Sequence, residues 1–308
     1  MKTLIGLLFL LSFGLSAAQT IPHADLSRYP VHTRPVNGID YAYLDEGSGP
    51  VLLLLHGFPD LAGGWDDVIE ALAQDYRCIA PFMRGYYPTG PAPDGDYNSS
   101  TVAEDIQQLA KDLGVDQYVA VGHDWGASVA YSLGDLHPEA VTKLITLAIP
   151  HPHYIKLTPA GLWRARHFIR LRKPSSSLDY TRRDNFAYID RLYRRWAPNW
   201  DGYQPSSDLF RRTLAEPGYL ESVLGWYWCL ADSRKDKEDP EVDYQQPPMP
   251  ILCFAGAADG AISEKAFHAM KADLGDQVTL RIVPKAGHWP HREAPELFLR
   301  EVRAFLAD

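Results

Sequence analysis

The chain has 308 residues, 46% of them hydrophobic and 22% charged, and a formal net charge of −9. This length can bury one large core, or a core with a subdomain. The excess of acidic residues argues against nucleic-acid binding, because such surfaces neutralise phosphates with cations. The absence of low-complexity tracts and internal repeats excludes a repeat array. One basic cluster, residues 163–173, is interpreted as a solvated helix face rather than a nucleic-acid or membrane site.

The N-terminal segment has the features of a secretory signal peptide. Lys2 precedes an apolar run at 4–15, and small residues follow at 16–18. The run is too short to cross a bilayer as a permanent span. We therefore expect a signal peptide at 1–18, cleavage after Ala18, and a secreted or periplasmic protein. The alternative is an uncleaved anchor.

Apolar, strand-like segments alternate with amphipathic, helix-like segments through 30–150 and again through 247–308. The Asn37-Gly38 pair between two strand-like runs predicts a hairpin turn. The unbroken apolar run at 51–55 indicates a strand covered on both faces. This alternation predicts an α/β core with a mostly parallel sheet. Further strands are predicted at 76–81, 117–122, 141–150, 250–256 and 277–283, and helices at 65–74, 101–114, 263–275 and 294–308.

The segment 151–246 interrupts the alternation. It is rich in Arg, Tyr and Trp, and residues 184–196 carry apolar side chains at helical spacing. Its end is charged and rich in Pro, as a linker is. Because strand-like segments lie on both sides of it, we predict a helical cap inserted over the edge of the sheet rather than a second domain in tandem.

The stretch VAVGHDWGASVA, residues 119–130, predicts a strand, a tight turn and a helix. This is the form of a nucleophile elbow, which raises its central side chain at the carboxyl edge of a sheet. Gly122 and Gly126 permit the close approaches that such a turn requires. The central residue is Asp124 where esterases have Ser, and the helix N-terminus favours its ionised form. The competing interpretation is an ordinary helix N-cap; the surrounding elements and the partners described next favour a nucleophile.

His288 and Asp259 are the predicted partners of this carboxylate. His288 lies in a Gly-His loop after the last predicted strand. The nucleophile, the acid and the His then follow one another in the order expected for hydrolases with such an elbow. Asp259 follows the strand at 250–256 and can orient and polarise the imidazole. His291 is the competing candidate for the base. Asp60 and Glu264 are the alternatives for the acid.

The HGFPD loop, residues 56–60, follows the first buried strand. In hydrolases with a nucleophile elbow, the loop at this position provides one backbone N–H of an oxyanion hole, and the residue after the nucleophile provides the other. These residues are Phe58 and Trp125, whose side chains we expect to line the cavity. His56 is expected to hold the loop. No Cys or His spacing is typical of a metal site, and we expect neither a metal nor a cofactor.

Five motifs carry a resemblance to a known family. In chain order they are HGFPD at 56–60, MRGYYPTG at 83–90, GHDWGASVA at 122–130, FAGAADGAI at 254–262 and GHWPHREAPE at 287–296. In this order they resemble the epoxide-hydrolase-like branch of the α/β-hydrolase superfamily, to which haloalkane and haloacetate dehalogenases are also related. The resemblance implies an α/β-hydrolase fold with a mostly parallel sheet, an inserted helical cap at 151–246, and a small, partly apolar substrate such as an epoxide or a haloalkane.

A carboxylate nucleophile suits displacement at saturated carbon. Attack on an ester would give an anhydride without advantage, whereas attack on an epoxide or halide carbon gives an alkyl-enzyme ester. His288 would then activate water, and the amides of Phe58 and Trp125 would stabilise the tetrahedral oxyanion. The predicted function is hydrolysis of an epoxide to a vicinal diol through an ester on Asp124.

Epoxide hydrolases usually direct two cap tyrosines at the epoxide oxygen. Tyr227, in LGWYWCL, resembles the second of them; the alternative is a packing aromatic. His167 or Arg170 occupies the place of the first. His167 can donate a hydrogen bond, whereas Arg170 stays protonated and can only steady an alkoxide or bind an anionic group. The other tyrosines that could serve there are Tyr180, Tyr188 and Tyr219.

Two other functions stay open. The first is a dehalogenase, since Trp125 also follows the nucleophile in haloalkane dehalogenases. Against it, Phe58 replaces the Asn that some of them carry, and Trp125 and Ser128 stand where haloacetate dehalogenases have Arg. The second is a non-catalytic binding protein that keeps the fold. The complete predicted triad argues against that alternative.

Overall fold

The computed structural model describes residues 21–155, 158–232 and 247–307. The predicted signal peptide at 1–18, with its cleavage point after Ala18, lies outside these residues. Within the described ranges, no helix combines the length and apolarity needed to cross a membrane.

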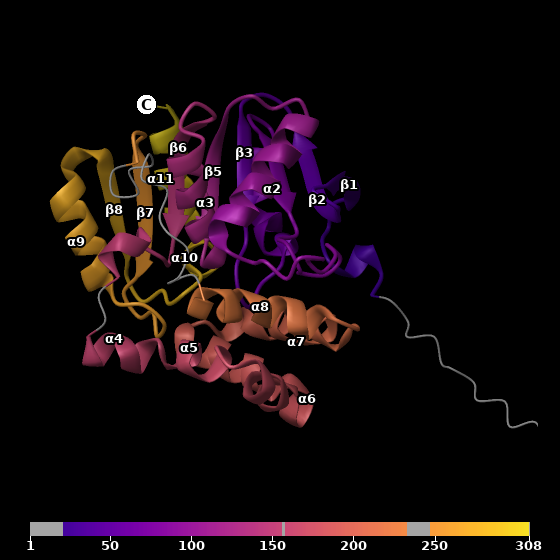
Figure 1. Cartoon of the computed structure of the whole chain (residues 1–308). Helices are drawn as coiled ribbons and strands as arrows, with labels where there is room; N and C mark the ends of the chain where they lie inside the picture. The colour runs from indigo at the N-terminus through magenta and orange to yellow at the C-terminus, as the bar shows by residue number, and fades with distance from the viewer. Residues whose placement is uncertain (1–20, 156–157, 233–246, 308) are drawn as a thin grey trace, which may run out of the picture.

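The core of the described chain is an eight-stranded sheet with the strand order β1-β2-β4-β3-β5-β6-β7-β8 (Figure 1). Neighbouring strands from β4 to β8 run parallel, whereas β1 and β2 form an antiparallel edge. The predicted mostly parallel sheet is therefore confirmed. The strands are β1 His32–Val36, β2 Ile39–Gly47, β3 Val51–Leu55, β4 Arg77–Pro81, β5 Tyr118–His123, β6 Val141–Leu147, β7 Ile251–Gly256 and β8 Val278–Val283.

The predicted hairpin turn joins β1 to β2. Asn37 and Gly38 have φ values of 48° and 81°. A two-residue hairpin needs positive φ at both positions, which Gly adopts without strain and Asn tolerates. The antiparallel edge follows from this turn, because parallel strands require a longer crossover connection.

Helices cover both faces of the sheet, which explains why its central strands are apolar along their whole length. Residues 52–55 of β3 and every residue of β5 are buried. In Figure 1, α2 and α3 lie in front of the sheet. On the other face, Arg303 of α11 donates a hydrogen bond to the carbonyl of Ala71 in α1. The core helices are α1 Asp66–Leu72, α2 Ser99–Asp112, α3 Trp125–Leu136, α9 Glu264–Leu274, α10 Pro290–Glu293 and α11 Pro295–Ala307.

Helices α4 to α8 are inserted between β6 and β7 and lie together below the sheet in Figure 1. Helix α6 is interrupted at 183–186, where Asp184, Asn185 and Phe186 have positive φ. The helix predicted at 184–196 corresponds to the second half of α6. The cap helices are α4 Pro159–Arg164, α5 Arg166–Leu171, α6 Pro174–Trp196, α7 Gln204–Ala215 and α8 Tyr219–Asp232.

Candidate active site

The turn between β5 and α3 holds Asp124 in a strained backbone conformation, with φ 53° and ψ −119°. The two glycines of the motif make the turn possible. A Cβ at Gly122 would lie 2.2 Å from the carbonyl oxygen of Gly126, and a Cβ at Gly126 would lie 2.1 Å from that of Leu55. Asp124 occupies the N-cap position, yet its carboxylate makes no capping hydrogen bond to the described helix. Its side chain is directed towards other partners.

The HGFPD loop approaches the carboxylate closely. The Phe58 N–H donates a hydrogen bond of 2.8 Å to Asp124 Oδ1. A Cβ at Gly57 would lie 2.5 Å from the Trp125 amide nitrogen and 2.6 Å from Asp124 Oδ1. The absence of that Cβ therefore lets the loop lie against the Trp125 amide and the Asp124 carboxylate. The Phe58 and Trp125 amides remain the predicted donors of an oxyanion hole.

His56 holds this loop from within. Its Nε2 accepts a hydrogen bond of 3.0 Å from the Met83 N–H, and its Nδ1 lies 3.2 Å from the Gly57 carbonyl oxygen. Accepting at Nε2 places the ring proton on Nδ1. Burial lowers the pKa of His56 to about 4, so the ring is neutral.

His288 lies between two carboxylates. Its Nε2 is 3.2 Å from Asp124 Oδ2, and its Nδ1 is 2.8 Å from Asp259 Oδ2. All three side chains are buried. The second oxygen of Asp259 accepts the Ala261 N–H at 2.6 Å, which fixes the carboxylate relative to the ring. The structure thus brings together the three residues that the sequence predicts as a triad.

The charges of this cluster stabilise one another. Burial disfavours the imidazolium, but Asp259 and Asp124 outweigh that cost and raise the pKa of His288 to about 10. Burial likewise disfavours the Asp124 carboxylate, but its contacts with His288 outweigh that cost and lower its pKa. Before reaction, the favoured state is an Asp124 anion beside a protonated His288.

The competing candidates occupy other positions. His291 is buried and stacks on Trp65, with 4.5 Å between ring centroids. Burial lowers the pKa of His291 well below the usual value, so the ring is neutral. Glu264 lies exposed in the first turn of α9. Neither residue contacts Asp124 within the described chain.

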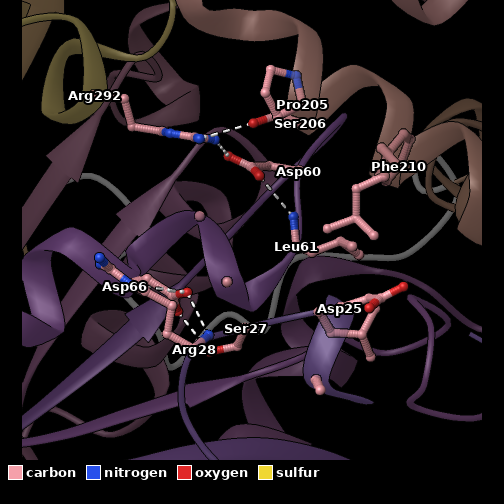
Figure 2. Close-up of a pocket in the computed structure, with 15 residues that line it drawn as sticks. Asp25, Ser27, Arg28, Asp60, Leu61, Asp66, Pro205, Ser206, Phe210 and Arg292 are labelled. Carbon is pink, nitrogen blue, oxygen red and sulfur yellow. Dashed lines mark hydrogen bonds and ion pairs between the residues drawn. The ribbon is translucent and has the colours of Figure 1, made fainter. Parts of the chain in front are cut away.

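Asp60 forms an ion pair beside the Phe58 loop. Its Oδ2 lies 3.4 Å from the Arg292 guanidinium, which also donates to Ser206 at 2.8 Å. Figure 2 shows these side chains around a pocket of about 240 Å³. Phe210 lines the pocket and packs against Phe58, with 5.6 Å between the ring centroids. Asp60 therefore stabilises the contact between the HGFPD loop and the cap. The carboxylate that contacts His288 Nδ1 is that of Asp259, not Asp60.

Tyr227 of α8 lies over the elbow. Its ring centroid is 5.3 Å from those of Phe58 and Trp125, and the side chain is buried. Burial and the nearby Asp124 charge raise the pKa of Tyr227 well above its usual value. The hydroxyl therefore keeps its proton and can donate it to an oxygen bound above Asp124.

His167 is the second cap residue at this position. Its ring centroid lies 6.1 Å from that of Tyr227 and 4.7 Å from that of Trp196. An Arg195 nitrogen lies 3.4 Å from His167 Nδ1. Because the guanidinium can only donate, Nδ1 accepts and Nε2 carries the proton. Burial, followed by the Arg195 charge, lowers the pKa of His167 to about 3, so the ring is a neutral donor.

Arg170 and the other tyrosines considered for this role lie apart from the elbow. Arg170 is exposed, and its guanidinium stacks 4.3 Å from the Tyr180 ring centroid. Tyr188 packs against Tyr180 at 4.8 Å, and the Tyr219 hydroxyl donates to the Pro88 carbonyl at 3.3 Å. The structure does not place Arg170 where it was predicted to bind substrate, because α5 turns His167 inward and Arg170 outward.

Two residues that the sequence did not single out fix the backbone around His288. His123 Nε2 lies 2.8 Å from the His288 carbonyl oxygen. The Glu293 carboxylate accepts the N–H groups of Gly287 and Trp289 at 2.7 and 2.9 Å. Both residues lie within motifs, GHDWG and GHWPHRE, but spacing alone gives no sign of these contacts.

The cap also supports the triad through one carbonyl group. The carbonyl oxygen of Trp196, the last residue of α6, accepts the His288 N–H at 3.0 Å and the Gly260 N–H at 3.3 Å. A Cβ at Gly287 would lie 2.3 Å from the same oxygen. The loops that carry the base and its acid are therefore both attached to the end of α6.

Several buried polar groups near Asp124 make no hydrogen bond within the part of the chain that the structure describes. They include the indole N–H of Trp125 and the hydroxyl of Tyr86. The Asp124 charge contributes to raising the pKa of Tyr86, after burial, which indicates how near this hydroxyl lies. A buried donor without a partner costs free energy, so these groups are available to a bound substrate. Sequence reasoning had assigned no role to Tyr86.

No group of three or more His, Cys, Asp or Glu side chains within the described ranges is arranged to hold a metal ion. A buried His between two carboxylates, one of them on a nucleophile elbow, is the arrangement of an α/β hydrolase. The alpha/beta hydrolase fold family matches residues 50–295, and the chain belongs to that family.

Similar proteins lie in the branch that the motifs resemble, which confirms the resemblance. The chain is 38% identical to epoxide hydrolase 2 of Caenorhabditis elegans over 266 residues, covering 83% of this chain and 74% of that protein. It is 28% identical to a fluoroacetate dehalogenase of Burkholderia sp over 279 residues, covering 85% of this chain and 88% of that protein. Its fold is similar to that of Bacillus megaterium epoxide hydrolase, with a TM-score of 0.79 at 24% identity, over 90% of this chain and all of that one.

Proposed function

We propose that this hydrolase converts epoxides to vicinal diols through a covalent ester on Asp124. The observation that carries the proposal is the placement of His288 between Asp124 and Asp259, with a carboxylate where an acyl hydrolase would have a hydroxyl nucleophile. A carboxylate gains by attacking saturated carbon, because the resulting ester can be hydrolysed by the same base. The 38% identity with a protein named epoxide hydrolase supports this choice of substrate.

In the first step, a carboxylate oxygen of Asp124 attacks an epoxide carbon and the bond from that carbon to the ring oxygen breaks. The ring oxygen takes the proton of Tyr227, while His167 donates a hydrogen bond from Nε2. Both groups are neutral donors, because burial keeps the proton on the phenol and the charge off the imidazole. The products of this step are an ester and a free hydroxyl group.

Formation of the ester removes the negative charge from Asp124. The pKa of His288 then falls, because that charge was one of the causes that raised it. The imidazolium proton restores the phenol of Tyr227, which leaves a neutral His288 oriented by Asp259. The charge on Asp124 thus keeps His288 protonated until the ester exists.

In the second step, His288 takes a proton from water as the water oxygen attacks the carbonyl carbon of the ester. The amides of Phe58 and Trp125 donate to the resulting oxyanion. Collapse of the intermediate breaks the bond to the diol oxygen, which takes the remaining proton of the attacking water. The cycle ends with Asp124 as a carboxylate and His288 protonated.

One observation favours a second candidate, a dehalogenase. The buried Trp125 N–H lies beside the Tyr227 hydroxyl and could donate to a departing halide. The relative named fluoroacetate dehalogenase is 28% identical. Both candidates share the ester on Asp124 and differ in the leaving group.

A single-turnover experiment in heavy-oxygen water tests both parts of the proposal. After reaction with a terminal epoxide or a haloalkane, mass spectrometry of the peptide that contains Asp124 should show incorporation of heavy oxygen. Diol release without halide release identifies an epoxide hydrolase, and the reverse identifies a dehalogenase. Turnover that persisted in Asp124→Ala would contradict the mechanism.

A further inference from the structure

Helices α4 and α5 of the cap expose large apolar side chains. Leu162 is 41% exposed, Trp163 70% and Ile169 54%. Among the described residues, Ile155 and Leu230 are the other large apolar side chains exposed to this degree. Single exposed apolar residues are common, but several of them on one pair of consecutive short helices indicate an interaction surface.

Basic side chains accompany these apolar residues. The Arg166 guanidinium stacks 4.3 Å from the Trp163 ring centroid. Arg170 of α5 is exposed, and so are Arg172 and Lys173, which directly follow that helix. Residues 158–196 contain ten Lys and Arg, three Asp and no Glu, in a chain whose net charge is −9. The charge of this part of the cap is therefore opposite to that of the molecule as a whole.

The same two helices turn their other side towards the active site. His167 and Leu171 of α5 are buried, and the Arg164 guanidinium donates to the carbonyl of Asp259. Figure 1 shows α4 and α5 below the sheet on the side of the cap away from β1 and β2. The sequence interpretation of 163–173 as a solvated face explains the exposed cations. It does not explain why Trp163 and Ile169 are exposed with them.

We propose that this surface binds an anionic lipid bilayer. The surface, called the cap patch below, combines an indole and aliphatic groups that can enter the headgroup boundary with cations that can meet lipid phosphates. Nucleic acid would match the cations but would leave the aliphatic groups in water. The proposal rests on the surface of the cap and does not depend on the substrate. The cap patch consists of Leu162, Trp163, Arg166, Ile169, Arg170, Arg172 and Lys173.

Docking through the cap patch would place the active site directly behind the bilayer contact. His167 lies on the buried side of α5, whose exposed side carries Ile169. A partly apolar substrate dissolved in the bilayer would then meet the cap before any other part of the enzyme. The bilayer also covers apolar surface that otherwise stays in water.

Vesicle flotation of the mature chain, which lacks the apolar segment at 1–18, tests the proposal. We expect the protein to float with vesicles of phosphatidylcholine and phosphatidylglycerol and to stay behind with vesicles of phosphatidylcholine alone. Added salt should weaken binding, because it screens the attraction between cations and lipid. The fluorescence difference between the wild type and Trp163→Phe isolates one indole, and its emission should shift to the blue on anionic vesicles.

Two double variants separate the apolar and the charged contributions. Trp163→Ser with Ile169→Ser should weaken binding at least about tenfold, because two apolar side chains no longer enter the bilayer. Arg172→Glu with Lys173→Glu should weaken it by a similar factor and reduce its dependence on salt. The matched control is Arg300→Glu with Arg303→Glu on α11, which changes the net charge equally and should bind more tightly than the Arg172-Lys173 variant. Circular dichroism and basal hydrolysis of a water-soluble substrate show that each variant is folded.

Other outcomes would overturn the proposal. If both patch variants float like the wild type and the Trp163 emission does not shift, the cap patch takes no part in bilayer binding. If the charge reversal on α11 weakens binding as much as that on the patch, attraction depends on net charge alone. If the wild type stays free of vesicles but self-associates, and Trp163→Ser with Ile169→Ser prevents this, the patch is covered by a second copy of the chain.

Discussion

At the scale of single residues, the neighbouring charged groups set the pKa of each buried histidine in the site. His288 touches two carboxylates and takes on a raised pKa of about 10, whereas His56 and His167 are buried without an anionic contact and have pKa values of about 4 and about 3. Burial acts in the same direction on all three rings, so the neighbouring carboxylates decide the difference. The protonation state of each histidine follows from its contacts.

Replacement of His288 should separate the two chemical steps. Under the proposed mechanism, Asp124 of His288→Gln can still attack the epoxide, but no base activates water. We expect the ester to accumulate and turnover to fall by a factor of about 10² to 10⁴. Intact-protein mass spectrometry after mixing with substrate would show the adduct. An unmodified, inactive variant would mean that His288 is also needed for the first step.

Replacement of the cap donors should slow the first step alone. Tyr227→Phe removes the proton donor of the proposed first step, and we expect the rate of ester formation to fall about 10²-fold or more. His167→Phe should have a smaller effect, because it removes one hydrogen bond. Rapid-quench measurement of ester formation checks both. Trp200→Phe, outside the site, is the control. Unchanged ester formation in Tyr227→Phe would exclude this hydroxyl as the donor.

The His288 pKa also predicts how stability depends on pH. The folded value of about 10 lies above the ordinary value of 6.5, so the folded protein holds a proton that the unfolded chain releases between these values. Stability from this group is fully present below pH 6.5 and is lost as pH rises towards 10, by about 1 kcal/mol per pH unit. Urea unfolding of the wild type and His288→Gln at pH 7 and 9 measures the difference. Parallel stability curves would contradict the prediction.

At the scale of elements, the active site depends on close approaches between loops. Gly57 brings the HGFPD loop against the elbow, Gly126 brings the elbow against the end of β3, and Gly122 lets the end of β5 lie close to the first turn of α3. These contacts leave no room for a methyl group. Local sequence therefore determines this part of the site more strictly than it determines the cap.

Gly57→Ala should disable the site without unfolding the core. The added Cβ would lie 2.5 Å from the Trp125 nitrogen, so the loop must move away from the elbow and the Phe58 N–H with it. We expect kcat to fall about 10²-fold, as for loss of one oxyanion donor. Gly90→Ala is the matched control, because its Cβ would meet Ile39 at an ordinary 3.7 Å. Thermal unfolding and kcat of both variants check the prediction, and equal activity would contradict it.

At the scale of the whole molecule, the sequence predicts the core better than the cap. The alternating strands and helices, the hairpin at Asn37-Gly38 and the mostly parallel sheet all depend on local patterns, and the structure confirms them. The structure also brings Asp124, Asp259 and His288 together. Each lies just beyond a strand, and the carboxyl ends of parallel strands meet at one edge of the sheet.

The cap could not be predicted to the same depth. His167 and Arg170 lie three residues apart, and the choice between them depends on the rotation of α5, a six-residue helix that begins after a break at Ala165. Arg195 contacts His167 from a distance of 28 residues in the chain. Such contacts are set by how helices pack, which local periodicity does not determine.

The carbonyl of Trp196 has a consequence for recombining parts of related enzymes. Exchanging caps between relatives would be a natural way to alter substrate range, with the junctions placed in the loops that flank the inserted segment. In this chain the end of α6 holds the loops that carry His288 and Asp259, since the Trp196 carbonyl accepts the His288 and Gly260 N–H groups. A transplanted cap must therefore place a backbone carbonyl oxygen within hydrogen-bond distance of the His288 and Gly260 N–H groups. The donor enzyme should be chosen for the position of that oxygen before the shape of its substrate pocket.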